Sequence, residues 1–275
     1  MYPGPILNLL INISFWIKGV LNIQTREYNN KNNFGYIMKR NYFNLIFLCT
    51  ILIICRILSP GGIEVIKSMI NPANQEIIVV IDAGHGGFDP GKIGVNKVLE
   101  KDINLSISLK LKALLEQDNI KVIMTREDDK GLYNANDRDK KRTDMQRRVS
   151  IINSSKASIA VSIHQNSFSQ ESSKGAQVFY HQRSEKGKIL AEILQEQLKE
   201  TIGDGNHRIA KGNGSYYMLR NTNCPLVIVE CGFLSNWREA NLLKQEDYQQ
   251  TVAKGIYLGI LKYFNQPENN KFHLK

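Results

Sequence analysis

The chain has 275 residues, of which 23% are charged and 42% are hydrophobic, and its formal net charge is +10. This length allows one sizeable folded domain with a tail or anchor, and the positive charge favours an anionic partner such as a membrane surface or a wall polymer. The basic residues are scattered apart from a dense run at 138–142, with no zinc-finger spacing or RNA-binding motif beside them. We therefore expect no nucleic-acid partner.

An apolar segment near the N-terminus is typical of a signal or membrane segment. Lys39 and Arg40 precede the mostly apolar stretch 43–58, and a basic flank before such a run fits a signal peptide or a slightly short anchor. Because no small-residue cleavage pattern follows, we favour an uncleaved membrane anchor over 38–58, with the remaining chain outside. A buried helix is the alternative.

The sequence on either side of this anchor is divided into an N-terminal extension, a linker, a folded domain and a C-terminal tail. Met38 opens a normal charge-then-apolar order, so we expect the natural start at Met38 and regard 1–37 as a doubtful extension. Residues 59–75 read as a linker, 76–265 as one folded domain, and 266–275 as a polar tail.

Strands and helices alternate through the domain. The five apolar residues Ile77 to Ile81 lead into Asp82 and a glycine-rich loop around His85, which predicts a buried strand that ends in a tight loop. This alternation predicts a single α/β domain with a mostly parallel central sheet flanked by helices. Further strands are expected at 121–125, 157–163, 175–180 and 226–229, and helices from about Glu100, at 144–153, from Ser184 to Gly203, and from Asn236 and Glu246.

Polar residues stand at the ends of three apolar strands. His85 and His164 follow two of these strands, and Glu230 ends a third. In open α/β sheets, ligands bind in the crevice beyond the carboxyl ends of the strands, and Glu100 can reach the same crevice. Two histidines with one carboxylate make a common hydrolytic zinc set, and a further carboxylate can act as general base.

Each of these residues also has a simpler interpretation. His85 can be an ordinary loop residue, Glu100 a favourable charge in the first turn of a helix, and His164 a histidine satisfied at a strand end. Glu230 is harder to explain in this way, because an ionised carboxylate after an apolar run needs a partner. His181 also ends a strand and is the best rival ligand.

Seven motifs stand in a fixed order along the chain: IDAGHGGFDPG, VLEKDINLSISLKLKALLE, MTRED, RVSIINSS, VSIHQNS, GAQVFY and VECGFLSN. In this order they resemble the zinc-dependent type-3 class of N-acetylmuramoyl-L-alanine amidases, over about 77–264. LEKDINL, GAQVFY and ECGFLSN, with the short anchor, look most like the germination-specific amidases of spore formers. One departure is Ala83, where the family usually has proline; it alters loop stiffness and removes no ligand.

The resemblance implies roles for four residues. His85, Glu100 and His164 would bind zinc, and Glu230 would be the catalytic base. The enzyme would cleave the amide bond between the lactyl group of N-acetylmuramic acid and L-alanine in peptidoglycan. Its product would then feed muramic δ-lactam formation in the spore cortex, so the domain would act outside the cytoplasm, with or without an accessory protein.

Two further residues are candidates for contacts with the substrate. Arg148 and Asn166 can steady the loops or the substrate, and the alternatives for them are a helix salt bridge and an Asx turn, respectively. Two other functions remain open from the sequence: a zinc peptidase on the same scaffold, and a wall-binding module that has lost its chemistry.

Overall fold

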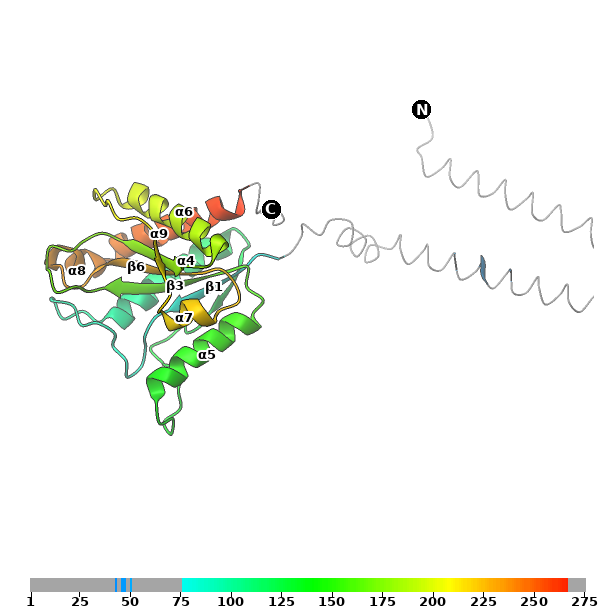
Figure 1. Ribbon diagram of the computed structural model, residues 1–275, viewed down its shortest axis with the longest axis horizontal. Coiled ribbons are helices and arrows are strands. Elements are labelled where there is room, and N and C mark those ends of the chain that lie inside the picture. The colour runs from blue at the N-terminus through cyan, green and yellow to red at the C-terminus, as the bar shows by residue number, and fades with distance from the viewer. Residues whose placement is uncertain (1–42, 44–45, 48–49, 51–75, 267–275) are drawn as a thin grey trace, which may run out of the picture. The chain divides into compact units, whose positions relative to one another are not determined.

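The computed structural model of the protein describes the domain from 76 to 266 and four residues before it, 43, 46, 47 and 50 (Figure 1). The expected extension at 1–37, nearly all of the expected anchor at 38–58 and the linker at 59–75 lie outside the described residues. No helix within the described part is both long enough and apolar enough to cross a membrane.

A six-stranded sheet forms the centre of the described domain. Its strands are β1 (Ile78–Ala83), β2 (Lys121–Met124), β3 (Ile159–Asn166), β4 (Gln177–His181), β5 (Lys211–Asn213) and β6 (Leu226–Phe233). They lie in the order β2-β1-β3-β6-β4-β5, and every neighbouring pair is parallel except β4 with β6. The predicted single α/β domain with a mostly parallel central sheet is therefore confirmed.

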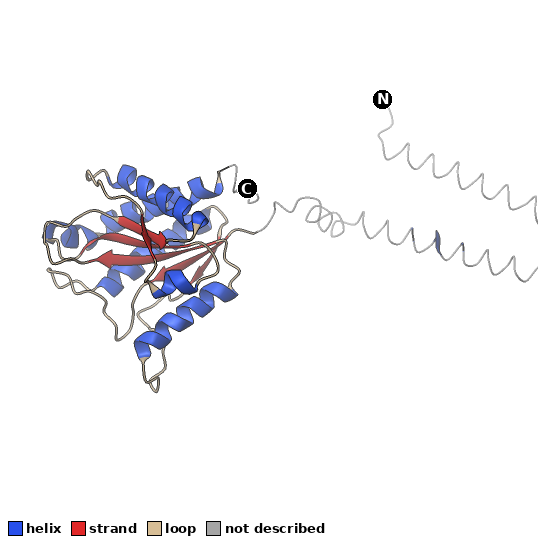
Figure 2. Cartoon of the chain, in the orientation of Figure 1, coloured by secondary structure: helices blue, strands red, loops and turns tan. Residues whose placement is uncertain are grey.

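Helices cover both faces of this sheet, as Figures 1 and 2 show. One face carries α4 (Glu100–Gln117), α6 (Glu185–Ile202) and α9 (Glu246–Phe264), and α4 and α6 each pack against α9. The opposite face carries α5 (Lys140–Ser154) and α7 (Tyr217–Asn221), and α8 (Trp237–Leu243) follows β6. Because both faces are covered, the central strands are apolar on both sides rather than alternating with polar residues.

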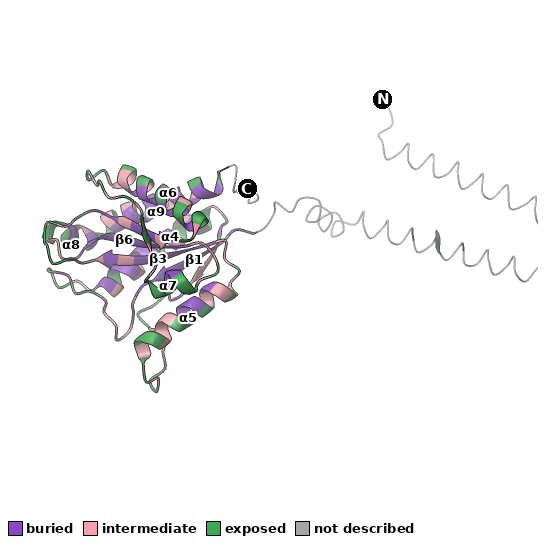
Figure 3. Cartoon of the chain, viewed as in Figure 1, coloured by how far each residue is buried: buried purple, intermediate pink, exposed green. Residues whose placement is uncertain are grey.

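The sheet separates two apolar cores, and Figure 3 shows its strands largely buried. Successive side chains of a strand point to opposite faces. In β1, Val79 and Ile81 therefore pack with the helices of the α4 face, and Val80 packs on the other face. That second core is completed by Val149 and Ile152 of α5 and by residues of α7. The two cores hold the carboxyl ends of the strands in a fixed arrangement.

The predicted helix ends agree with the capping chemistry of the sequence. Ser184 accepts a hydrogen bond from the backbone N–H of Gly187 at the start of α6, and Gly203 ends that helix at a φ of 64°. Asn236 caps α8 in the same way. The helix expected at 144–153 starts at Lys140 instead, because the carboxylate of Asp139 caps an additional turn.

Two central strands are longer than expected. β3 continues to Asn166 and β6 continues to Phe233. His164 and Glu230 therefore lie within these strands, directly opposite each other in register, and the pairing becomes irregular immediately after His164. The short elements β5 and α7 were not predicted, because three and five residues carry too little periodicity to be recognised.

Candidate active site

Three side chains that can bind a metal converge at the carboxyl edge of the sheet. His85 comes from the loop after β1, Glu100 opens α4, and His164 lies on β3. Glu100 Oε1 is 3.2 Å from His85 Nε2 and 3.0 Å from His164 Nδ1. The ligand atoms of all three lie within 4.8 Å of one another. One carboxylate oxygen therefore faces both imidazole rings.

Glu100 is much more than a favourable charge at the start of a helix. It is buried, its Oε2 accepts the backbone N–H of Lys92 at 2.7 Å, and its Oε1 accepts that of Gln165 at 3.1 Å. Burial by itself would raise its pKa, but the hydrogen bonds and charges of His164 and His85 hold the pKa well below its usual range. A low pKa favours the carboxylate form of Glu100 between the two imidazoles, a setting that suits a bound cation.

A second carboxylate orients His85. Asp89 Oδ2 lies 2.9 Å from His85 Nδ1, which leaves His85 Nε2 to face Glu100. Burial would raise the pKa of Asp89, but the hydrogen bond and charge of His85 lower it. A carboxylate on the second ring nitrogen is the usual way in which a metal-binding histidine is oriented. Asp89 was not singled out from the sequence, although it lies only four residues after His85.

Glu230 carries an unpaired buried oxygen beside this cluster. Its Oε2 is buried and has no hydrogen-bond partner among the described residues. Burial, reinforced by the charge of Glu100, raises its pKa to about 7, against the opposing effects of His164 and His85. Buried polar atoms in folded proteins are nearly always hydrogen-bonded. A buried carboxylate oxygen without a partner among the described residues is available to bind a group in the cavity beside it.

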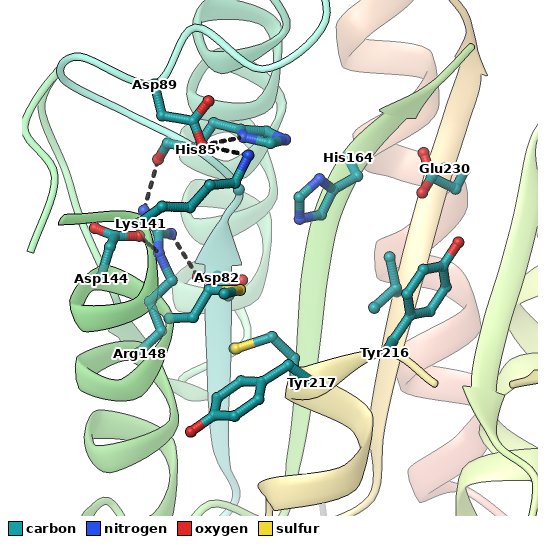
Figure 4. A pocket seen from close by; sticks show the side chains of 14 residues that line it. Asp82, His85, Asp89, Lys141, Asp144, Arg148, His164, Tyr216, Tyr217 and Glu230 are labelled. Atoms are coloured by element: carbon teal, nitrogen blue, oxygen red, sulfur yellow. Dashed lines mark hydrogen bonds and ion pairs between the residues drawn. The ribbon is translucent and has the colours of Figure 1, made fainter. Parts of the chain in front are cut away.

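A cavity of about 190 Å³ is lined by His85, Asp89, His164 and Glu230, whereas Glu100 lies outside its lining (Figure 4). In Figure 4, His164 stands between His85 and Glu230, and Tyr216 lies on the Glu230 side. Lys141 of α5 lies at the edge of the cavity, with its Nζ 3.5 Å from Asp89 Oδ2. The apolar part of the wall is formed by Met145, Tyr217, Met218 and Ile228. Its α7 residues carried no signal in the sequence, because α7 is so short.

The two expected substrate residues differ in position. Arg148 lines the cavity, but its buried guanidinium is bonded to Asp82, to Asp144 four residues earlier, and to the carbonyl of His85. The helix salt bridge considered for it is therefore present. Asn166 is not among the residues that line the cavity, and its Oδ1 accepts the backbone N–H of Ser167.

His181 does not join the cluster. Among the described residues, the one group of His, Cys, Asp or Glu side chains arranged to hold a metal is His85, Glu100 and His164. His181 lies on β4, and β6 separates β4 from β3, the strand that carries His164.

Comparison with known proteins identifies the class to which this α/β domain and its site belong. Residues 79–262 match the family model described as N-acetylmuramoyl-L-alanine amidase. The chain belongs to this family and is an amide hydrolase that acts on peptidoglycan. The resemblance drawn from the seven motifs is therefore confirmed.

Within the family, the similar proteins include a germination-specific amidase and two amidases of known structure. The germination-specific N-acetylmuramoyl-L-alanine amidase of Bacillus subtilis is 37% identical over 192 residues, which are 69% of this chain and 80% of that protein. The CwlD amidase of Clostridioides difficile, solved with the GerS lipoprotein, is 43% identical, with a TM-score of 0.67 and coverage of 68% and 98%. The catalytic domain of CwlV from Bacillus (Paenibacillus) polymyxa is 34% identical, with a TM-score of 0.61 and coverage of 69% and 98%.

Proposed function

We propose that the chain is a zinc-dependent amidase in which His85, Glu100 and His164 hold the metal. The observation that carries this proposal is the buried, ionised Glu100, whose Oε1 lies within 3.2 Å of a nitrogen of each imidazole. Two histidines and one carboxylate, with a position left for water, form a common catalytic zinc set. When bound, zinc supplies Lewis acidity, which brings the pKa of a water close to 7 and polarises the amide carbonyl.

Glu230 is the proposed catalytic base. Glu230 lines the cavity, and its carboxylate can accept a proton from the attacking water. The same carboxyl group can then donate that proton to the nitrogen of the departing alanine. A general acid–base works best when its pKa lies near the working pH, and burial raises the pKa of Glu230 to about 7.

Product analysis tests the proposed reaction. We expect peptidoglycan fragments digested by the protein to yield a free lactyl carboxylate and a stem peptide that begins with alanine, with the yield dependent on added zinc. A zinc peptidase on the same scaffold would leave alanine attached to muramic acid. Mass spectrometry of the digest separates these outcomes, and zinc-independent release of the same products would refute the metal assignment.

The first turn of α5 supplies the proposed contact with the anionic stem peptide. It contains Lys140, Lys141 and Arg142 and no acidic residue. Positive side chains at a helix N-terminus oppose the helix dipole, so this arrangement costs local stability. Lys141 lines the cavity and has a largely exposed side chain. We therefore propose that the Lys141 ammonium group binds a carboxylate of the stem peptide.

Replacing Lys141 with Gln should raise KM for a stem-peptide substrate up to about fivefold and leave kcat nearly unchanged, because an exposed ion pair contributes at most about 1 kcal/mol. The effect should shrink when the carboxylates of the stem peptide are amidated. Lys186→Gln is the matched control, since Lys186 is an exposed lysine in the first turn of α6. Equal KM values for Lys141→Gln and wild type would refute this contact.

We also propose a role in spore cortex maturation, which similarity to the germination-specific amidase of Bacillus subtilis supports. We propose that the product feeds muramic δ-lactam formation, that the domain works outside the cytoplasm, and that 38–58 anchors it to the membrane. Because a similar amidase was solved with a lipoprotein, an accessory protein is part of this proposal. Normal muramic δ-lactam in spores that lack this protein would contradict the cortex role.

A further inference from the structure

The loop that carries His85 has an unusual backbone. His85 has a φ of 63°, and Gly86 and Gly87 follow with φ values of 132° and 61°. Residues other than glycine rarely adopt positive φ, and they keep it only where the surrounding structure holds them. The position of His85 therefore depends on contacts outside its own loop.

Two buried arginines supply these contacts through three consecutive carbonyl groups. Arg126, which follows β2, donates from Nε to the carbonyl of Ala83 at 2.8 Å and from Nη2 to that of Gly84 at 3.0 Å. Arg148 of α5 donates from Nη1 to Ala83 at 2.7 Å and from Nη2 to His85 at 2.6 Å. The backbone leading into His85 is thus held from two different elements.

Arg126 also joins this loop to the helix that carries Glu100. Its Nη2 donates to the carbonyl of Lys101 at 2.8 Å, and its Nη1 donates to that of Asp128 at 3.0 Å. A Cβ added to Gly86 would lie only 2.9 Å from Arg126 Nε, so the guanidinium packs closely beneath the loop. Lys101 and Asn104 of α4 also donate to this loop, to the carbonyls of Gly87 at 2.9 Å and Gly84 at 3.1 Å. Arg126 is thus one of three side chains that fix the His85 backbone relative to the start of α4.

We infer that Arg126 is a positioning residue that sets the affinity of the site for zinc. It is buried, is absent from the cavity lining and touches no reacting atom. A planar guanidinium can bind several carbonyls at fixed angles, whereas a lysine ammonium cannot reproduce that geometry. This inference rests on the proposed metal site. It goes beyond that site because Arg126, which is not a ligand, controls the distance between the ligands His85 and Glu100.

The test measures zinc affinity in the purified full-length protein by competition with a chromophoric chelator. Arg126→Lys should weaken zinc binding at least about tenfold, the lower end of the losses seen when groups that orient ligands are removed. Excess zinc should restore most of kcat, which a purely structural defect would not allow. Arg208→Lys is the matched control, because Arg208 likewise donates to a backbone carbonyl, that of Lys174, and within the described domain makes no hydrogen bond to the His85 loop or to α4. The zinc affinity of this control should equal that of wild type.

The outcomes separate this inference from the metal site itself. If wild type binds zinc tightly and Arg126→Lys has the same dissociation constant for zinc, the inference is wrong and the metal proposal stands. Failure of wild type to bind zinc would overturn the metal proposal. If Arg126→Lys does not fold, Arg148→Lys tests the same loop from the α5 side, and unchanged zinc affinity there would also count against the arginine pair.

Discussion

Replacing Glu230 with Gln is expected to lower kcat by about 10²- to 10⁴-fold, the usual contribution of a general acid–base. The amide keeps the shape of the side chain but cannot accept a proton from the attacking water. Zinc stoichiometry should not change, because Glu230 is outside the group of three side chains arranged to hold a metal. Release of stem peptide, measured alongside bound zinc, checks both parts of this expectation.

The same variant should be more stable than wild type in the metal-free form at alkaline pH. Burial raises the pKa of Glu230 from 4.5 to about 7 in the folded protein. Wild type therefore loses stability as the pH rises from 4.5 to 7, because the unfolded chain releases a proton that the folded chain still holds. The glutamine variant lacks this loss, so its advantage should be on the order of 3 kcal/mol above pH 7 and absent below pH 4.5.

Chemical denaturation at pH 8 and pH 4 measures this difference directly. A stable variant with lost turnover would show that the missing activity is chemical rather than a consequence of unfolding. Wild-type turnover in Glu230→Gln would remove Glu230 from the mechanism, whatever its effect on stability.

Replacing Glu100 with Gln should weaken zinc binding more than about 100-fold, beyond the range seen for groups that only orient ligands. The substitution removes the negative charge that faces His85 and His164 and keeps the size of the side chain. Activity at limiting zinc should fall with occupancy. Asp102→Asn is a close control, since Asp102 is an exposed carboxylate in the same first turn of α4.

The two variants together distinguish a metal ligand from a helix-start charge. If Glu100 mattered only through the helix dipole, Glu100→Gln and Asp102→Asn would have similar small effects on stability and none on zinc affinity. Equal zinc affinity in both variants would therefore contradict the assignment of Glu100. A loss confined to Glu100→Gln would support it.

Local chemistry explains why much of the fold was predictable. The run from Ile77 to Ile81 is apolar because β1 is covered on both faces, and Ser184 and Asn236 mark helix starts through side-chain caps. Such signals act over a few residues and are visible in any sequence. β5 and α7 were missed because their contacts are with distant parts of the chain, and α7 forms one wall of the cavity.

The sequence by itself determined the α/β class, the family and the four candidate residues around the glycine-rich loop of His85. Only the tertiary structure decided how they meet. The neighbouring positions of β3 and β6 put Glu230 opposite His164, where its Oε2 is buried and has no hydrogen-bond partner within the described part of the chain. The hold of Arg126 on the His85 loop is likewise a contact between segments some 40 residues apart in the chain. Strand order and burial arise from packing over the whole domain, and no local pattern of residues encodes them.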